Sequence, residues 1–531
     1  GVLLVIAFIL GIAGHGDATS TDATRARWAL LFAVAFELVV VALASTHRKP
    51  YQLLFTGLVA VELFFASRKL AYNAPLPAEV YSDIRPPEAV LSSDHGLFRV
   101  LSVAADNYDP GDKADLTRLF GPDLTPDELE QFIVGTKWKE VLTPNLSMAY
   151  HVDGLDGYDG GVLPLRSYVE LKKLFVPPCP GCDNPDAILR NQLHAPPDLT
   201  WMSLLNVKYL IADKLHDGWD KSVYYDLSNT VQLNPERPWL HLHGFSEAPA
   251  DSLGLVTSLT GASTVPDGTP VARVVVSDAS GRSYDLQLRA GSDTAEAAWT
   301  TDAAHKMPKP FPDHPQTTGP RDYLAVLPLP TDVWVTSIDV KYLLDMGQIN
   351  VDGAALIDGA LGSSVSVPVA DDGALTTVES GDTKVYRNNL AAPRAFFVSS
   401  VRLASSDADA LSTMQELGAG SLLPGGTAVI TYPVGETHAS APYRLLNALS
   451  DRLNGIAPSQ PPSLPSAALG TDRLSPQGKV TTVRTQPERL EFSTSTPRGS
   501  YLVVSDQYFP GWRAEIDGRP TSLYRADYLL K

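Results

Sequence analysis

The sequence predicts transmembrane α-helices followed by a large multi-domain region that combines α/β parts with an all-β sandwich or jelly roll. Three observations predict this fold class. Apolar runs crowd the first 72 residues, mixed helix and strand patterns follow from residue 73, and a stretch near the middle alternates polar and apolar residues with a period of two. At 531 residues the chain is long enough for three or four domains of ordinary size.

Composition excludes two broad classes of protein. Lys and Arg number 42 against 60 Asp and Glu, which gives a net charge of −18. Nucleic-acid binding needs a basic surface that displaces counterions from phosphates, so we expect no nucleic-acid partner. The chain has 2 cysteines, too few for a disulfide-rich scaffold.

The first three apolar runs, residues 1–13, 28–44 and 51–66, are each slightly shorter than the ~20 residues that span a bilayer. We interpret residues 1–72 as three transmembrane helices, the first being the tail of a longer span, with the lipid bilayer as a partner. Glu37 and Glu62 fall inside these runs. A carboxylate in hydrocarbon suggests a functional role, although a hydrogen bond to a neighbouring helix or a position near the interface would also explain it.

The remaining chain divides by its patterning. Residues 73–250 have mixed α/β signals, including helices expected at 125–133 and 165–175 and a strand at 207–212. Residues 251–380 predict a carbohydrate-binding-like β-sandwich insertion, because β-branched runs are joined by Gly/Asp turns. A second α/β segment (381–457), a Pro/Ser linker (458–470) and a β-rich C-terminal domain (471–531) follow.

Two pairs of residues could carry chemistry. Cys179 and Cys182 form a single CPGC in a loop, which fits a local disulfide, two free thiols, or a metal or redox use. His241 and His243 are two apart on an expected strand, so both rings point to one face. Neither pair is accompanied by further ligands in sequence, and we therefore expect no metal site and no cofactor.

Two stretches, residues 151–166 and 505–518, combine aromatic, charged and Gly/Pro residues. Aromatic rings beside polar groups are typical of sugar-binding surfaces, where a ring stacks on a pyranose. An aromatic residue packed at a Gly/Pro turn would give the same pattern. The candidate glycan contacts are Tyr158, Asp159, Arg166, Tyr508, Trp512, Arg513 and Asp517.

The segments GLFRVLSV, LDGYDGGVLPLRSYVEL, WMSLLNVKYLIAD, KVYRNNLAAPRAFFV and SYLVVSDQYFPGWRAEIDGRPTSLYRADYLL occur in that order. Together they resemble the YfhO-like family of bacterial multi-span membrane proteins, and the resemblance covers residues 73–251 and 381–531. It implies the C-terminal portion of a GT-C-type glycosyltransferase that transfers a sugar from a polyprenyl-phosphate donor to a cell-envelope acceptor. It also implies a multi-pass plasma-membrane protein with residues 73–531 extracytoplasmic.

The catalytic carboxylate of such enzymes lies in a loop that this sequence does not contain, so the resemblance assigns no catalytic residue. We expect the extracytoplasmic region to handle the acceptor or the glycan. The alternative is a non-catalytic envelope membrane protein whose ectodomain binds glycan or another protein.

Overall fold

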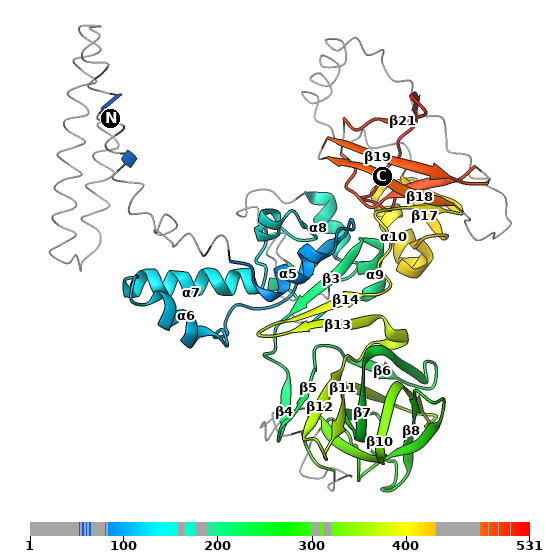
Figure 1. Ribbon diagram of the computed structural model, residues 1–531. Helices are drawn as coiled ribbons and strands as arrows, with labels where there is room; N and C mark the ends of the chain where they lie inside the picture. Colours follow the sequence, from blue (N-terminus) through cyan, green and yellow to red (C-terminus); the bar gives the residue numbers. More distant parts are fainter. Residues whose placement is uncertain are drawn as a thin grey trace, which may run out of the picture. The chain divides into compact units, whose positions relative to one another are not determined.

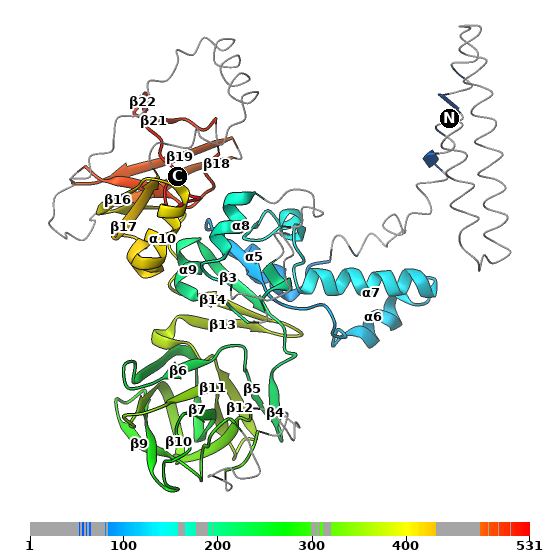
Figure 2. The same ribbon diagram turned by 180° about the vertical axis from the view of Figure 1, so that it is seen from behind.

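The computed structural model is shown from two opposite sides in Figures 1 and 2. The structure describes residues 53, 56, 57, 60, 63 and 64, and residues 80–531 apart from 81, 82, 158–164, 177–188, 194, 299–304, 306, 307, 312–319, 432–477, 487, 498 and 510.

The predicted fold class requires correction. Of the residues that the structure describes, 41% are in strands and 21% in helices. None of the described helices is long and apolar enough to span a bilayer. The longest of them, α7 (Pro126–Glu140), has 15 residues and carries charges along its length. It measures about 22 Å, against about 30 Å for a hydrocarbon core. The same finding contradicts the predicted transmembrane class and the multi-pass plasma-membrane localisation, and it does not bear on the predicted sugar transfer. The predicted spans lie almost entirely outside the described residues.

The chain forms two compact units, and the first comprises Gly1–Asp83 and Asp112–Gly135. Its described part contains α6 (Lys113–Phe120) and most of α7. A reciprocal capping box starts α7: the Thr125 amide donates to Glu128 Oε2 at 2.9 Å, and the Glu128 amide donates to Thr125 Oγ1 at 3.3 Å. Phe132 packs on Phe120, with ring centroids 4.5 Å apart. The helix predicted at 125–133 is therefore confirmed.

The second unit, Ile84–Gly111 and Thr136–Lys531, contains a five-stranded central sheet of order β13-β14-β3-β1-β2. Strands β1 and β2 run parallel to one another, as do β1 and β3, whereas β14 is antiparallel to both of its neighbours. In both views β3, β14 and β13 lie side by side (Figures 1 and 2). In sheet order the strands are Leu375–Ser380, Lys384–Asn388, Val207–Ala212, Arg99–Ser102 and Asp153–Gly154.

Helices cover both faces of the central sheet. Successive side chains of a strand point to opposite faces, so neighbouring residues of β1 pack against different helices. Val100 packs in one buried cluster with Leu91 of α5 (Pro86–Ser93). Its neighbour Leu101 packs in another with Met202 of α9 (Leu199–Leu204). The remaining helices around this sheet are η2 (Leu146–Tyr150), α8 (Arg166–Lys172) and η3 (Leu189–Asn191).

A seven-stranded antiparallel sheet has the order β12-β11-β7-β10-β8-β9, with β6 paired to β11. Strands β7 and β10 pair along most of their length, and register shifts after Pro328 and Val335 interrupt the ladder. Leu242 and Leu255, from the two halves of β7, belong to one core cluster, so the sheet folds over a single core. From β6 to β12 the strands are Val231–Leu233, Trp239–Thr260, Pro270–Asp278, Ser283–Arg289, Tyr323–Tyr342, Gln348–Asp358 and Ser363–Val367.

A hairpin of β4 (Gly218–Asp220) and β5 (Val223–Tyr225) lies in the chain between β3 and the seven-stranded sheet. Tyr225 of this hairpin covers β7 so closely that a Cβ on Gly254 would lie 2.2 Å from the tyrosine hydroxyl oxygen. Residue 254 must therefore be glycine for the hairpin to seat on the sheet. The boundary predicted between residues 250 and 251 falls inside β7.

The C-terminal part is built from strand pairs. Strand β16 is parallel to β17, with α10 and η5 between them, and β15, β18 and β21 are antiparallel to β20, β19 and β22. The second α/β segment predicted at 381–457 contains both strands and a helix, whereas its residues 432–457 and the predicted linker lie outside the described residues. The elements are η4 (Asp371–Gly373), β15 (Ala395–Val398), β16 (Ser400–Ala404), α10 (Asp407–Leu417), η5 (Ala419–Leu422), β17 (Thr427–Thr431), β18 (Lys479–Gln486), β19 (Arg489–Ser495), β20 (Tyr501–Val504), β21 (Ala514–Ile516) and β22 (Arg519–Thr521).

Candidate functional site

A small cavity lies where two parallel strands of the central sheet end. Val103 directly follows β1, and Asp213 directly follows Ala212, the last residue of β3. In sheets with parallel strands, ligands bind preferentially outside the carboxyl ends of the strands. The position of this cavity in the fold therefore makes it a candidate binding site.

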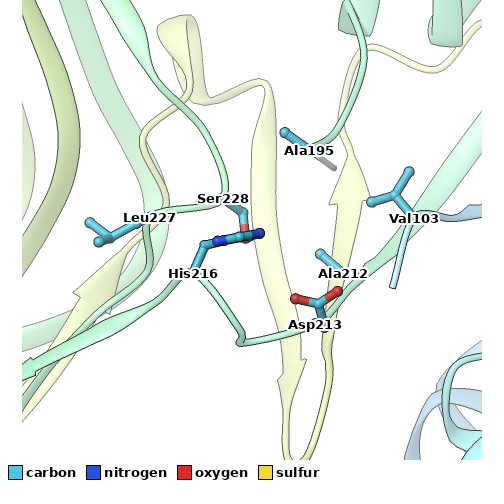
Figure 3. A pocket seen from close by; sticks show the side chains of 7 residues that line it. All are labelled: Val103, Ala195, Ala212, Asp213, His216, Leu227 and Ser228. Carbon is cyan, nitrogen blue, oxygen red and sulfur yellow. The ribbon is translucent and has the colours of Figure 1, made fainter. Parts of the chain in front are cut away.

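The cavity has a volume of about 210 Å³ (Figure 3). Val103, Ala195, Ala212 and Leu227 give it apolar walls, and the polar groups are those of Asp213, His216 and Ser228. Ala195 and His216 are exposed, so the rim is open to solvent. Pockets for drug-sized ligands have about 300–1,000 Å³. This cavity suits a smaller molecule, or one unit of a larger one.

The carboxylate of Asp213 is held in place by the backbone. The Ala105 amide donates to Oδ2 at 2.8 Å, and the Leu215 amide donates to Oδ1 at 3.0 Å. Each carboxylate oxygen can accept a second hydrogen bond. Asp213 can therefore offer two fixed acceptor positions to a ligand.

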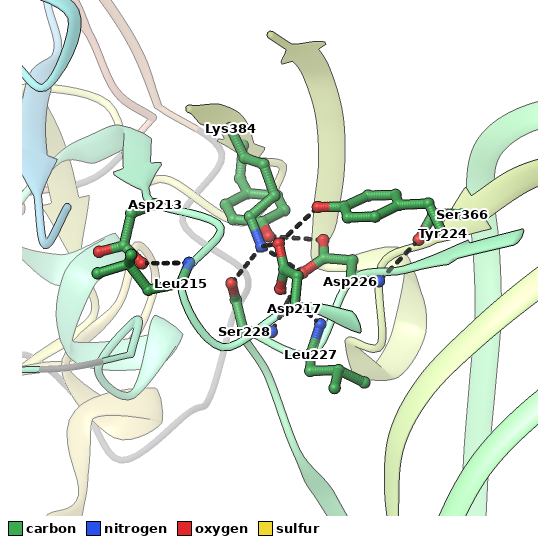
Figure 4. A network of polar contacts seen from close by, with 10 residues as sticks. Asp213, Leu215, Asp217, Tyr224, Asp226, Leu227, Ser228, Ser366 and Lys384 are labelled. Carbon is green, nitrogen blue, oxygen red and sulfur yellow. Dashed lines mark hydrogen bonds and ion pairs between the residues drawn. The ribbon is translucent and has the colours of Figure 1, made fainter. Parts of the chain in front are cut away.

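Behind Ser228 lies a buried charged network centred on Lys384 of β14 (Figure 4). Its ammonium donates to Asp217 at 2.5 Å, to Asp226 at 2.8 Å and to Ser228 Oγ at 2.5 Å. The side chains of Lys384, Asp217 and Asp226 are 1%, 2% and 6% exposed. All three N–H donors of the lysine are used, which a buried ammonium requires.

Two tyrosines complete the network. Tyr224 donates its hydroxyl to Asp217 and Tyr386 donates its hydroxyl to Asp226, both at 2.5 Å. Burial raises the pKa of Tyr224 and that of Tyr386, and the adjacent carboxylates raise both further. Both phenols therefore stay protonated and act as donors.

The network fixes the chain segment that lines the cavity. The Leu227 amide donates to Asp217 at 2.9 Å, and the Ser228 amide donates to Asp226 at 3.1 Å. Burial raises the pKa of Asp217, and the ammonium of Lys384 opposes that rise. One cation faces two carboxylates here, which makes the surroundings unfavourable for an anion.

The cavity contains Ser, His and Asp, but the geometry does not support acyl transfer. A nucleophilic serine needs a base that accepts its proton. Lys384 is a donor to two carboxylates and to Ser228, so it cannot take that role. No hydrogen bond among the described residues joins His216 to Ser228. The arrangement can bind and orient a ligand.

The predicted aromatic stretches lie elsewhere in the second unit. Trp512 is half-buried, with Lys531 Nζ 3.3 Å from its ring centroid. Asp517 and Gly518 have φ values of 50° and 74° and form the hairpin turn between β21 and β22. The Tyr508 amide donates to the Leu529 carbonyl at 2.7 Å, and burial raises the pKa of its phenol. Arg513 is exposed.

The two predicted stretches are each linked to a buried arginine. Arg394 pairs with Asp153 of the first stretch at 2.6 Å, and Arg99 lies 3.6 Å from Asp506 of the second. Burial and, to a smaller extent, the positive charge of Arg394 lower the pKa of Arg99 to about 10. Arg166 is exposed at the start of α8. Outside the described residues lie Tyr158, Asp159, Cys179, Cys182, Glu37 and Glu62.

His241 and His243 share the exposed face of β7, as predicted. The Nδ1 atom of His241 lies 2.7 Å from Asp339 Oδ1, and its ring stacks on Trp239 with centroids 5.6 Å apart. His243 Nε2 lies 3.4 Å from Asp372. Within the described part of the chain, no group of three or more potential ligands could hold a metal ion.

Sequence reasoning missed the cavity residues and Lys384. One available signal was Asp213, a carboxylate directly after the strand that was predicted at 207–212. A second signal was Lys384, a charged residue directly before Val385 in a segment with the pattern of a strand. Comparison with known proteins adds no further assignment, since no family model, curated protein or solved structure matches the chain. The YfhO-like resemblance therefore stays a prediction.

Proposed function

We propose that the chain is a carbohydrate-binding protein and that the cavity beside Asp213 holds one neutral sugar residue. The observation that carries the proposal is the carboxylate of Asp213, oriented by two backbone amides at the carboxyl ends of β1 and β3. Sugar hydroxyls are donors that match such fixed acceptors, and apolar walls can contact the ring carbons.

Charge supports a neutral ligand. The chain has a net charge of −18, and the nearby network places two carboxylates against one ammonium. Both features disfavour an anionic ligand. His216 and Ser228 add groups that can donate or accept, which suits a molecule with several hydroxyls. Sugar transfer from a polyprenyl-phosphate donor and binding of another protein remain predictions.

The test is calorimetric titration of the full chain with glucose, galactose, mannose and N-acetylglucosamine. Asp213→Asn keeps the shape of the side chain and removes its charge. We expect it to weaken binding by at least about tenfold, because hydrogen bonds to charged groups contribute about 1.5–3 kcal/mol.

Asp285→Asn is the matched control. Asp285 is an exposed carboxylate on β9, paired with Arg273, and it does not line the cavity. Absence of binding by all four sugars, or equal affinity of wild type and Asp213→Asn, would contradict the proposed function.

A further inference from the structure

Two large apolar side chains are exposed on the same segment that supplies Asp213 and His216 to the cavity. Leu215 is 46% exposed and Trp219 is 56% exposed. Trp219 follows His216 by three residues, which limits the distance between their Cα atoms to about 11 Å. The exposed indole therefore belongs to the same segment as two of the residues that line the cavity.

The position of Trp219 is fixed relative to the cavity. It pairs with Tyr224 across the β4–β5 hairpin, and the two ring centroids are 5.1 Å apart. The Tyr224 hydroxyl bonds to Asp217, which in turn accepts the amide of Leu227, a residue of the cavity wall. Lys309 also pairs with Asp220 of the hairpin at 2.6 Å.

We infer that the ligand is an oligosaccharide of neutral sugars, with its terminal residue in the cavity and a following residue on the indole of Trp219. This inference rests on the proposed function. A cavity of about 210 Å³ has room for one sugar residue, so a longer glycan must continue outside it. An aromatic face is the group on which a sugar ring stacks, and Trp219 has an exposed indole three residues after His216 of the cavity.

The inference is tested by titrating the full chain with each monosaccharide and with the corresponding linear trisaccharide. We expect the trisaccharide of the preferred sugar to bind roughly tenfold more tightly than the monosaccharide. Trp219→Ala should remove this gain and leave the affinity for the monosaccharide within about twofold. Trp219→Phe should restore part of the gain, because it keeps an aromatic face.

Trp334→Ala is the control, since Trp334 is another exposed tryptophan, 48% accessible, on β10 of the seven-stranded sheet. It should change neither affinity. Circular dichroism of each variant checks that the fold is retained. Equal affinity for the two ligand lengths, or an unchanged trisaccharide affinity in Trp219→Ala, would overturn the inference while monosaccharide binding still supports the proposed function. If no sugar binds, both fail together.

Discussion

Replacing Lys384 by methionine removes the ammonium that contacts two buried carboxylates, those of Asp217 and Asp226. Lys384 donates three hydrogen bonds of 2.5, 2.8 and 2.5 Å, and its side chain is 1% exposed. Breaking a buried ion pair from one side costs about 3–5 kcal/mol, because the remaining charge is left uncompensated. We expect a loss in this range for opening of β3 and β14 at pH 7.

Hydrogen–deuterium exchange measures this loss locally, which suits a chain whose several parts need not unfold in one step. Amides of β3 and β14 should exchange faster in Lys384→Met, whereas amides of β8 and β9 should not change. Adding Asp217→Asn and Asp226→Asn removes all three charges, and protection should then largely return. A loss below about 1 kcal/mol in the single variant, or no recovery in the triple variant, would show that the buried carboxylates do not depend on the charge of Lys384.

The pH dependence of Lys384→Met has a definite sign. Burial already raises the pKa of Asp217 in the folded chain, and the variant lacks the ammonium that opposes this rise. A carboxyl group whose pKa is higher in the folded than in the unfolded chain does not affect the free energy of unfolding below the unfolded-state pKa of about 4. As the pH rises from that value toward the folded-state pKa, the group lowers the free energy of unfolding. The deficit of the variant should therefore be larger at pH 8 than at pH 5. A deficit that grows on acidification would contradict this assignment.

Two further predictions concern packing. Gly254→Ala should destabilise the packing of the hairpin on the seven-stranded sheet by about 1–3 kcal/mol in thermal melts, because the added Cβ would clash with Tyr225. Gly420→Ala is the control and should have little effect, because the nearest atom to its added Cβ is 3.8 Å away. Trp512→Ala should cost less than the ~3–5 kcal/mol of a fully buried large residue, because Trp512 is half-buried, although the substitution also removes its cation–π contact with Lys531. A loss of the full amount would show that Trp512 is a core residue.

Local elements were predictable from the sequence, whereas their long-range pairing was not. The strand Val207–Ala212 and the helix at Thr125 carry their signals within a few residues. By contrast, β14 joins β3 across more than a hundred residues that form the seven-stranded sheet, and no local pattern encodes that pairing. The domain boundary predicted between residues 250 and 251 lies inside β7, one residue after Pro249, which is paired with Trp334 of β10.

The candidate site was hidden for the same reason. Asp217 and Asp226 are ordinary loop and turn residues in sequence, and only the tertiary fold places them on the ammonium of Lys384. The two aromatic stretches were predicted as sugar-binding surfaces from their composition of aromatic, charged and Gly/Pro residues. In the structure, Asp517-Gly518 makes a hairpin turn and Asp506 lies beside Arg99 and Lys531. Composition shows which side chains a segment contains, whereas their contacts depend on the tertiary fold.

The most direct test of the proposed function is a crystal structure of the full chain with the monosaccharide that binds most tightly in the titrations. We expect a sugar ring in the cavity, with a hydroxyl within hydrogen-bond distance of the Asp213 carboxylate and another near Ser228 or His216. A saturated crystal in which the sugar occupies a different surface, with the cavity beside Asp213 holding water alone, would contradict it.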